Sequence, residues 1–138
     1  MHQLEFSIQT EGRGTYDLTR RVAEAVEESG IATGLCHIFL RHTSASLMLC
    51  ENADPAVLRD MESFMSRLTP DGDPMYTHTA EGPDDMPAHI KASTLGASVS
   101  VPIREGRLNL GTWQGIYLCE HRDHGGARRI VVTISGDT

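Results

Sequence analysis

Apolar residues alternate with polar ones near both ends of the chain, and this pattern constrains the fold more than any other feature. Leu4, Phe6 and Ile8 alternate with polar residues near the N-terminus, and the segment 127–135 alternates in the same way. A period of two residues is typical of strands that bury one face. The sequence therefore predicts a half-buried strand at each end of the chain.

Two segments between these strands repeat apolar residues with the helical period. The first spans residues 16–30, with Asp17 as the predicted N-cap and Gly30 as the predicted stop. The second begins at Asp54 and Pro55. An N-cap residue followed by proline is a strong start signal for a helix. Proline lacks a backbone N–H, and the N–H groups of the first turn have no partner within the helix, so no hydrogen bond is lost.

The rest of the chain predicts one short helix and several further strands. The helix is expected to be capped by Asp84 or Asp85 and to end near Gly96. The segment 34–41 has apolar residues on both faces and is predicted to be a fully buried strand, and residues 124–126, His-Gly-Gly, a hairpin turn. The other predicted strands are 44–50, 97–103, 108–110 and 112–122.

The order of these elements predicts the fold class. There is no regular alternation of strand and helix, so the fold is expected to be α+β with mainly antiparallel sheet and two to three helices. A length of 138 residues is typical of one domain, and nothing in the sequence divides it. We therefore predict a single compact domain over residues 1–138.

Composition excludes several classes of function. The net charge of −7 argues against nucleic-acid binding, which requires a basic surface, but allows a local site for a small anion. The apolar runs are too short to cross a bilayer and the N-terminus lacks the pattern of a secretory signal, so a cytoplasmic protein without a membrane partner is expected. The three cysteines are far apart and predict neither a disulfide nor a CxxC metal site.

Histidines are the residues most suggestive of chemistry, and there are seven of them. His37 lies within a predicted strand and is expected to be a hydrogen-bonded core residue. His121 and His124 flank the predicted hairpin and are expected to face solvent. His42, at the end of an apolar strand, and His78 and His89, in and after the aperiodic segment, remain as candidate ligands.

Three neutral imidazoles suit zinc or a similar divalent ion and leave a coordination position for water or substrate. His42, His78 and His89 are therefore candidate metal ligands, but no linear metal motif is present, and their spacing alone is equally compatible with unrelated histidines. Asp85 precedes His89 by four residues, so on a helix it lies on the same face and is positioned to accept the second ring proton.

Other polar residues near these histidines have both structural and functional interpretations. Thr43 and Ser44 are positioned either to bind an anion or to form an ordinary strand turn. Glu81, Asp84 and Asp85 form an acidic group before and at the start of the predicted short helix. Capping of that helix explains one of these carboxylates but not all three. Asn52 lies in a tight connection, where it either bonds the backbone or faces a pocket.

Two features of the last third of the chain have similar alternatives. Trp113 and Gln114 follow a glycine and either line a pocket or belong to the core. Glu120 shares the face of an apolar strand and needs a partner, for which Arg122, Arg128 and Arg129 are candidates.

Three blocks of sequence together resemble the YjbQ family, the secondary thiamine-phosphate synthase enzymes. They are HTSASLMLCENADPAVLRD, HTAEGPDDMPAHIK and LNLGTWQGIYLCEHRDHGGARRIVVTISG. The resemblance covers nearly the whole chain. It implies an α+β domain whose antiparallel sheets pack as a sandwich or pseudo-barrel, a homotrimer, and polar pockets near the subunit boundaries.

The resemblance also implies metal ligation by His42, His78 and His89 and places polar residues of the family's blocks at Asn52 and Glu81. The family's activity is a weak synthesis of thiamine monophosphate, in which a thiazole phosphate replaces the diphosphate of a pyrimidine. Such chemistry generally uses magnesium with oxygen ligands, whereas three histidines favour zinc. This difference suggests that thiamine synthesis is a side activity.

These observations support three hypotheses. The first is a metal-dependent trimeric enzyme that acts on a small phosphorylated or heterocyclic molecule. In it Glu81, Asp85 and Asn52 are the catalytic candidates, and the substrate is bound by Thr43, Ser44, Lys91, Trp113 and Gln114, with Lys91 or Arg41 at a phosphate. The second is a metal-stabilised trimeric module that binds a metabolite without turnover. The third is a hydrolase that uses a metal-bound hydroxide.

Overall fold

β8 lies between β1 and β3 and brings both ends of the chain into one antiparallel sheet, in a computed structural model that describes residues 1–138. This sheet has five strands in the order β1-β8-β3-β5-β6, and a second sheet has three in the order β2-β7-β4. The strands of the first sheet are β1 His2–Gln9, β3 Thr33–Leu40, β5 Ser98–Arg104, β6 Arg107–Leu108 and β8 Ala127–Asp137. Those of the second are β2 Gly14–Asp17, β4 Ala45–Glu51 and β7 Gln114–Glu120. The helices are α1 Thr19–Ser29, α2 Pro55–Leu68 and α3 Asp85–Leu95.

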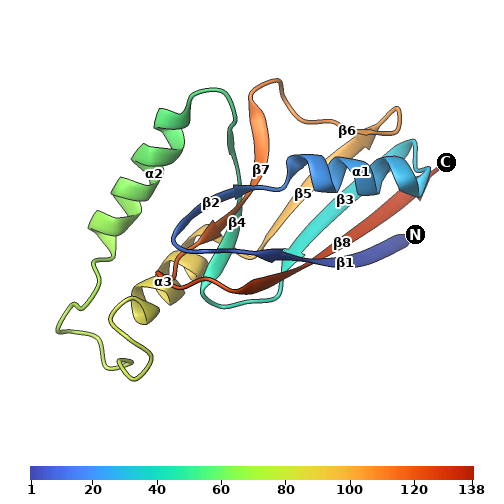
Figure 1. Cartoon of the computed structure of the whole chain (residues 1–138). Coiled ribbons are helices and arrows are strands. Elements are labelled where there is room, and N and C mark those ends of the chain that lie inside the picture. The colour runs from blue at the N-terminus through green and yellow to red at the C-terminus, as the bar shows by residue number, and fades with distance from the viewer.

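One face of each sheet contributes to a shared apolar core of 17 buried residues. The alternation predicted for the C-terminal strand is confirmed, since Ile130, Val132 and Ile134 are fully buried while their neighbours are not. α1 lies across this face of the large sheet, and its residues Val22 and Val26 close the core (Figure 1). The predicted α+β class with antiparallel sheets and three helices is confirmed.

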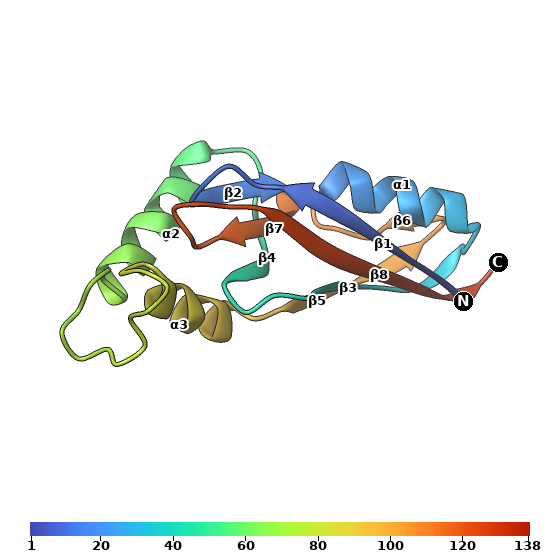
Figure 2. The same ribbon diagram turned by 60° about the horizontal axis from the view of Figure 1, so that its bottom comes forward.

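β3 was predicted to be buried on both faces, and this prediction is wrong. Cys36 and Ile38 are fully buried, but Leu35 and Phe39 on the other face are 46% and 44% exposed. The physical reason is that α1 covers only the core face of the sheet, so that apolar residues on the outer face stay in contact with solvent (Figure 2).

Two local predictions at turns also differ from the structure. The segment before the first helix forms β2, which pairs with β7, and α1 begins only at Thr19, whose N–H donates to the Asp17 carboxylate. Residues 124–126 do not make a hairpin, because β7 and β8 belong to different sheets. Both differences come from pairing with strands far away in sequence, which local patterns do not encode.

The predicted helix signals are largely confirmed. Asp54 caps α2 by accepting a hydrogen bond from the N–H of Ala56, with Pro55 at the first position. Gly30 ends α1 in the left-handed conformation, with φ of 73°. Asp84 occupies the N-cap position of α3, but its side chain makes no capping hydrogen bond, because it is engaged by residues after β7.

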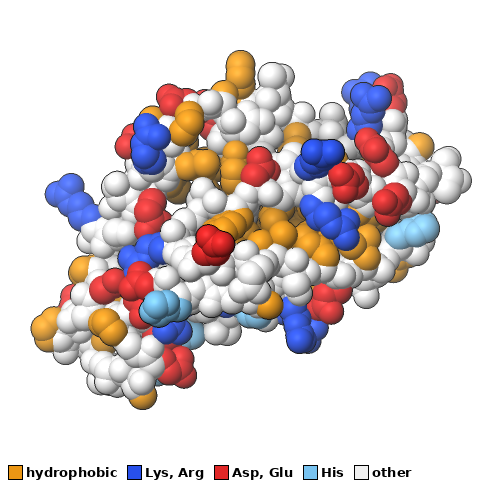
Figure 3. Space-filling model, in the orientation of Figure 1, with side chains coloured by type: hydrophobic (Ala, Val, Ile, Leu, Met, Phe, Trp, Pro, Cys, Tyr) orange, Lys and Arg blue, Asp and Glu red, His pale blue; other side chains and the backbone are white.

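α2, α3 and the loop between them gather at one end of the molecule, opposite the two termini (Figures 1 and 2). Acidic, basic and histidine side chains lie together on the surface there, and charged side chains also gather at the other end of the molecule (Figure 3). None of the helices is both long and apolar enough to span a membrane. The polar end formed by the loop and α3 is where the candidate site lies.

Close backbone contact between β3 and β8 gives a test of this architecture. A Cβ at Gly34 would lie 2.0 Å from the carbonyl oxygen of Ser135, so Gly34→Ala forces the two strands apart. We expect a loss of about 1–3 kcal/mol in the free energy of unfolding, typical of overpacking, measured by urea denaturation. Gly126→Ala is the matched control, since nothing lies within 4 Å of that position, and it should be neutral or slightly stabilising.

Candidate metal centre

His78, Asp85 and His89 form a cluster whose potential ligand atoms all lie within 4.8 Å of one another. His78 comes from the loop before α3, and the other two residues come from the first turns of that helix. The Nε2 atoms of His78 and His89 lie 2.6 Å and 3.0 Å from the same oxygen, Oδ2 of Asp85. The structure thus brings together two of the three histidines predicted as ligands, with Asp85 as the third member.

The second ring nitrogen of His89 fixes how this cluster is protonated. Its Nδ1 lies 2.9 Å from the backbone carbonyl oxygen of Thr43, which can only accept, so Nδ1 carries a hydrogen. In the neutral ring Nε2 then presents a lone pair to the Asp85 carboxylate, which is repulsive. The contact is favourable only if a cation lies there, either a second ring proton or a metal ion.

Asp85 is a buried carboxylate that is held in its ionised form. It is 1% exposed, and its other oxygen, Oδ1, accepts a hydrogen bond of 2.6 Å from Arg122. Burial by itself raises the pKa of Asp85, but the hydrogen bond from His78 and the charges of His89 and Arg122 outweigh it and lower that pKa. An ionised Asp85 is available as a metal ligand.

Arg122 holds the start of α3 and the loop together. Its guanidinium donates to the carboxylates of Asp84 and Asp85 and to the backbone carbonyl of Glu81. The backbone N–H of Asp123 completes the arrangement by donating to Asp84 at 2.9 Å. This arginine was not predicted as a site residue, and its pairing across 37 residues with Asp85 leaves no local pattern in the sequence.

A cavity of about 350 Å³ opens beside His89, between the end of β3 and the last turns of α3. Its polar lining residues are His42, Thr43, His89 and Ser93. Of the predicted substrate-binding residues, Thr43 therefore lies at the cluster. Ser44 is adjacent in sequence, and its hydroxyl accepts a hydrogen bond from Arg128.

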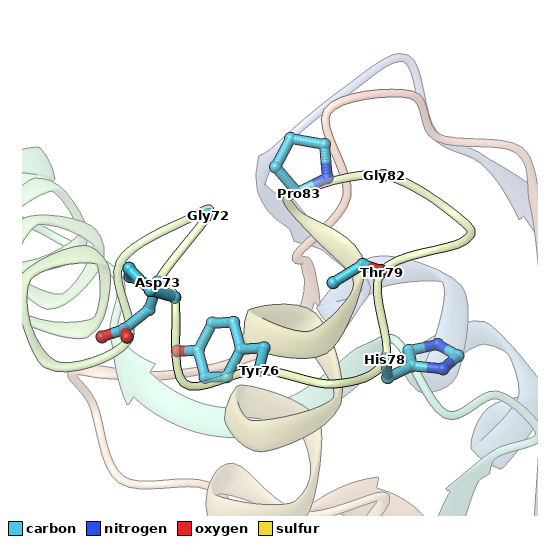
Figure 4. Close-up of a pocket in the computed structure, with 8 residues that line it drawn as sticks. Gly72, Asp73, Tyr76, His78, Thr79, Gly82 and Pro83 are labelled. Atoms are coloured by element: carbon cyan, nitrogen blue, oxygen red, sulfur yellow. The ribbon is translucent and has the colours of Figure 1, made fainter.

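A second cavity of about 370 Å³ lies within the loop before α3, on the side of His78. Tyr76, Thr79 and Pro83 surround it, and the backbone N–H of Gly72 closes the loop by donating to the carbonyl of Pro83. The imidazole of His78 points away from Tyr76 (Figure 4). The cluster thus has space on both sides, one cavity reaching His89 and the other His78.

His42 lines the cavity beside His89 but lies outside the cluster. Its Nε2 accepts a hydrogen bond of 2.8 Å from the backbone N–H of Arg129, so this nitrogen is not free to bind a metal. Burial, and then the charge of Arg128, lowers the pKa of His42, which favours the neutral ring. The arrangement differs from the predicted set of three histidines, because Asp85 stands where His42 was expected.

Several other predicted site residues lie elsewhere. Lys91 is fully buried and lines neither cavity, so it does not fit the role of a phosphate contact. Asn52, Trp113 and Gln114 lie at the opposite end of β4 from Thr43, which a seven-residue strand puts roughly 20 Å away. Within one chain they cannot contact a molecule bound at the cluster.

The structure also shows where Glu81 and the histidines predicted to lie outside the metal site are located. Glu81 is exposed and contributes its carbonyl to Arg122, and its carboxylate makes no hydrogen bond or ion pair. His121 is 2% exposed, so the prediction that it faces solvent is wrong. The chain does not turn back in a hairpin there but crosses from the small sheet to the large one. His37 bonds Ser100, as a hydrogen-bonded strand residue does.

The buried Glu120 finds the partner that its position required. Arg128 donates to both of its oxygens, and Thr10 donates at 2.6 Å. Burial by itself raises the pKa of Glu120, but the hydrogen bonds from Arg128 and Thr10 outweigh it and lower that pKa. Because Arg128 also bonds Ser44, this ion pair fixes the segment that leads to the cavity beside His89.

Two imidazoles and one carboxylate are a donor set that suits a catalytic zinc ion. The hydrogen bond from Nδ1 of His89 to a backbone carbonyl is the outer contact that orients most metal-binding histidines. The Arg122 contact does the same for Asp85. The residues present therefore fit a divalent transition metal at His78, Asp85 and His89.

The Glu120–Arg128 pair makes a prediction for stability. Glu120→Gln leaves a buried guanidinium without its counter-charge and should cost about 3 kcal/mol at pH 7. Because the folded-state pKa is lowered, the contribution is complete above the unfolded value of about 4.3 and is lost as the pH falls through the folded value. The wild type and variant should thus converge in acid. Urea denaturation against pH measures this, with Glu5→Gln, an exposed pair with Arg41, as a control worth about 0–1 kcal/mol.

Comparison with known proteins identifies the family. The profile described as "UPF0047 protein YjbQ-like" matches residues 4–137. The UPF0047 protein YjbQ of Salmonella typhimurium is 48% identical over 139 residues, and the alignment covers 99% of each chain. A UPF0047 protein of Synechocystis is 46% identical, and the alignment covers 99% of this chain and 92% of that protein.

Solved structures agree with the sequence comparison. A YbjQ-like protein of unknown function from Sulfolobus solfataricus has a TM-score of 0.90 at 31% identity, covering 99% of this chain and 97% of that one. An uncharacterised protein from Clostridium acetobutylicum has a TM-score of 0.87 at 41% identity, covering 96% and 99%. The chain belongs to the YjbQ/UPF0047 family.

Proposed function

We propose that this protein is a metal-dependent enzyme that acts on a small phosphorylated or heterocyclic substrate at the His78–Asp85–His89 cluster. Zinc is the favoured ion, because two imidazoles and a carboxylate suit it better than magnesium, which prefers oxygen ligands. The ion would supply a Lewis acid that stabilises negative charge developing on the substrate.

The observation that carries this proposal is the contact between His89 and Asp85. With Nδ1 committed to the carbonyl of Thr43, Nε2 faces a carboxylate oxygen at 3.0 Å, and this contact requires a positive charge between the two atoms. A metal ion satisfies both lone pairs at once. His78 directs its own Nε2 to the same oxygen, which gives the ion a third ligand.

The chain's own residues supply the remaining requirements of a reaction. Thr43 and Ser93 line the cavity beside His89, and their hydroxyls are suited to hold a substrate oxygen. His42 lines the same cavity as a neutral ring, with its protonated Nδ1 as a donor. Glu81 lies in the exposed loop between His78 and Asp85 and, as a carboxylate without a hydrogen-bond partner, is the candidate general base.

Two reactions deserve assay because both would use this site. The first is the synthesis of thiamine monophosphate that the sequence resemblance suggests, expected to be slow because the donor set favours zinc. The second is hydrolysis of a small phosphate ester, for which three protein ligands with a position left for water is the usual arrangement at zinc. Either one requires the cluster and the cavity beside His89.

Removing a ligand of the cluster should remove metal and turnover together. We expect the wild type to bind one zinc ion per chain and His89→Ala and Asp85→Asn to bind it more than about 100-fold more weakly, since loss of an outer partner alone costs about 10–100-fold. Elemental analysis and calorimetric titration measure the affinity. Product formation from thiamine precursors and from phosphate esters measures turnover.

Two histidine variants serve as controls for that experiment. His124→Ala removes an exposed imidazole outside the cluster and should leave metal affinity unchanged. His42→Ala should also keep the metal; equal loss in His42→Ala and His89→Ala would favour the three-histidine set instead. Full activity in metal-free His89→Ala protein contradicts the proposal. Ligand-induced stabilisation without any product would favour a binding module.

We also propose that the chain assembles as a homotrimer, as the family resemblance suggests, and that α2 forms the contact between copies. α2 buries only Met65, whereas Phe64 and Leu68 are 62% and 58% exposed, an arrangement unusual for an amphipathic helix. A second copy against this helix would cover these side chains. Neighbouring copies would also offer a way to bring Trp113, which is 63% exposed, near the cavity of another chain.

A single charge on α2 should disrupt the assembly. Phe64→Glu is expected to convert trimers into monomers, because a carboxylate is costly to bury in an apolar interface. Light scattering during size-exclusion chromatography measures the mass. Arg20→Glu, on the exposed face of α1, is the control and should leave the mass unchanged. Wild-type protein that is monomeric at micromolar concentration would contradict the proposal.

A further inference from the structure

A second apolar layer lies between α2 and the small sheet (Figures 1 and 2). Leu47 of β4 and Leu118 of β7 face the shared core. Met48 and Cys119, which follow them in sequence, therefore point the other way, toward α2. The shared core of 17 residues contains no methionine, whereas three of the six methionines of the chain lie in the layer beneath α2.

A cavity of about 10 Å³ lies within this layer, which is enough space for one water-sized particle. Five residues with sulfur or nitrogen donors line it: Met48 from β4, Met61 and Met65 from α2, Cys119 from β7, and His121 just after β7. A particle in so small a space is in contact with the residues that line it. The cavity thus brings these five residues around one point.

One nitrogen of His121 has no partner in the protein. The residue is 2% exposed, its Nε2 lies 2.9 Å from the hydroxyl of Ser46, and its Nδ1 is buried without a hydrogen bond. A hydroxyl accepts as well as donates, so Nε2 can carry the ring hydrogen and leave a lone pair on Nδ1. Buried polar atoms almost always have a partner, so Nδ1 is the nitrogen of this ring that is available to a ligand in the cavity.

The methionines supply donors that few metal ions prefer. A thioether is neutral, soft and polarizable, and such ligands select Cu(I), whereas zinc takes thiolate, imidazole and carboxylate. Met61 and Met65 are four residues apart and share one face of α2. Each side chain has three rotatable bonds, so both sulfurs can turn toward the cavity without a change in the backbone.

We propose that Met48, Met61, Met65 and His121 bind one Cu(I) ion between α2 and the small sheet. Thioether sulfurs and an imidazole nitrogen together give this ion a set of neutral ligands that suits it. A buried cation also needs a negative charge nearby. Glu62 lines the same cavity, and its carboxylate provides that charge.

The proposed ligand set does not require Cys119. Burial raises the pKa of the Cys119 thiol to about 12, and a neutral thiol is a weak ligand compared with a thiolate. The competing occupant of the cavity is a water molecule. Methionines also fill irregular gaps in protein cores without binding anything, and one water bonded to Nδ1 of His121 would then fill the space. Titration with copper distinguishes the two occupants.

The Cu(I) site is separate from the candidate metal centre. Its cavity shares no lining residue with either of the cavities beside His78 and His89. From α3 only Leu95 reaches it. Cu(I) would hold α2, which otherwise buries only Met65, against the small sheet. This effect does not depend on the proposed enzymatic function.

Affinity for Cu(I) should depend on the methionines of α2 and not on the candidate metal centre. We titrate full-length protein with Cu(I) without oxygen, in competition with a chromophoric Cu(I) chelator. His89→Ala, which disrupts the metal centre, should still bind one ion per chain. Adding Met61→Leu and Met65→Leu, which conserve volume, should weaken binding more than about 100-fold, since loss of an outer partner alone costs about 10–100-fold. Met75→Leu in the same background is the matched control and should change nothing, because Met75 is 76% exposed and outside the cavity.

A measurement on the wild type keeps the proposal testable if the α2 variants fail to fold. In protein labelled with ¹³C-methyl methionine, Ag(I), a soft analogue of Cu(I), should shift the signals of Met48, Met61 and Met65 together. Zinc should leave these three signals unchanged. Methionine signals that do not respond to Ag(I) overturn the proposal. Equal Cu(I) affinity with and without the two leucine substitutions on α2 also overturns it, and leaves water as the occupant of the cavity.

Discussion

The ion pair between Arg122 and Asp85 is the interaction on which the candidate site depends. A carboxylate that is 1% exposed stays ionised only if donors replace the water it has lost. Arg122 provides this at Oδ1, and Oδ2 is thereby left to face the two imidazoles. The same guanidinium holds Asp84 and the carbonyl of Glu81, so the loop that carries His78 and the helix that carries His89 are fixed relative to each other by one side chain.

The two residues that follow β7 point in different directions. His121 points into the interior, toward Ser46, while Arg122 points to the start of α3. α3 shows the same division, with His89 on one face and Lys91 on another. The segment after β7 and the helix α3 each place side chains on several sides, so residues that are adjacent in sequence serve the candidate metal centre and the interior. Glu120, one residue earlier, adds the ion pair with Arg128.

The sequence predicted those features that depend on local patterns. Asp54 and Pro55 begin a helix because the cap and the missing N–H act within one turn, and Asp85 and His89 share a face because they are four residues apart. β2 was missed because its four residues are a strand only through pairing with β7. Burial of Lys91 and His121 was not predicted, since residue type favours the surface and only packing between distant segments, such as that of α3 on β4, decides otherwise. His42 ends a strand as expected, but the backbone N–H of Arg129, 87 residues away, takes its nitrogen.

The chemistry of the cations also explains how they are distributed. The carboxylates of Asp84, Asp85 and Glu120 are all buried and are all met by arginine, whose planar fork bonds carboxylate oxygens in pairs. The one lysine is kept away from them. An ammonium is a compact point charge without the planar fork of a guanidinium, and it gains less than arginine from a planar carboxylate. The buried carboxylates are therefore paired with the cation whose shape matches them, and this pairing allows an acidic chain to keep three carboxylates out of water.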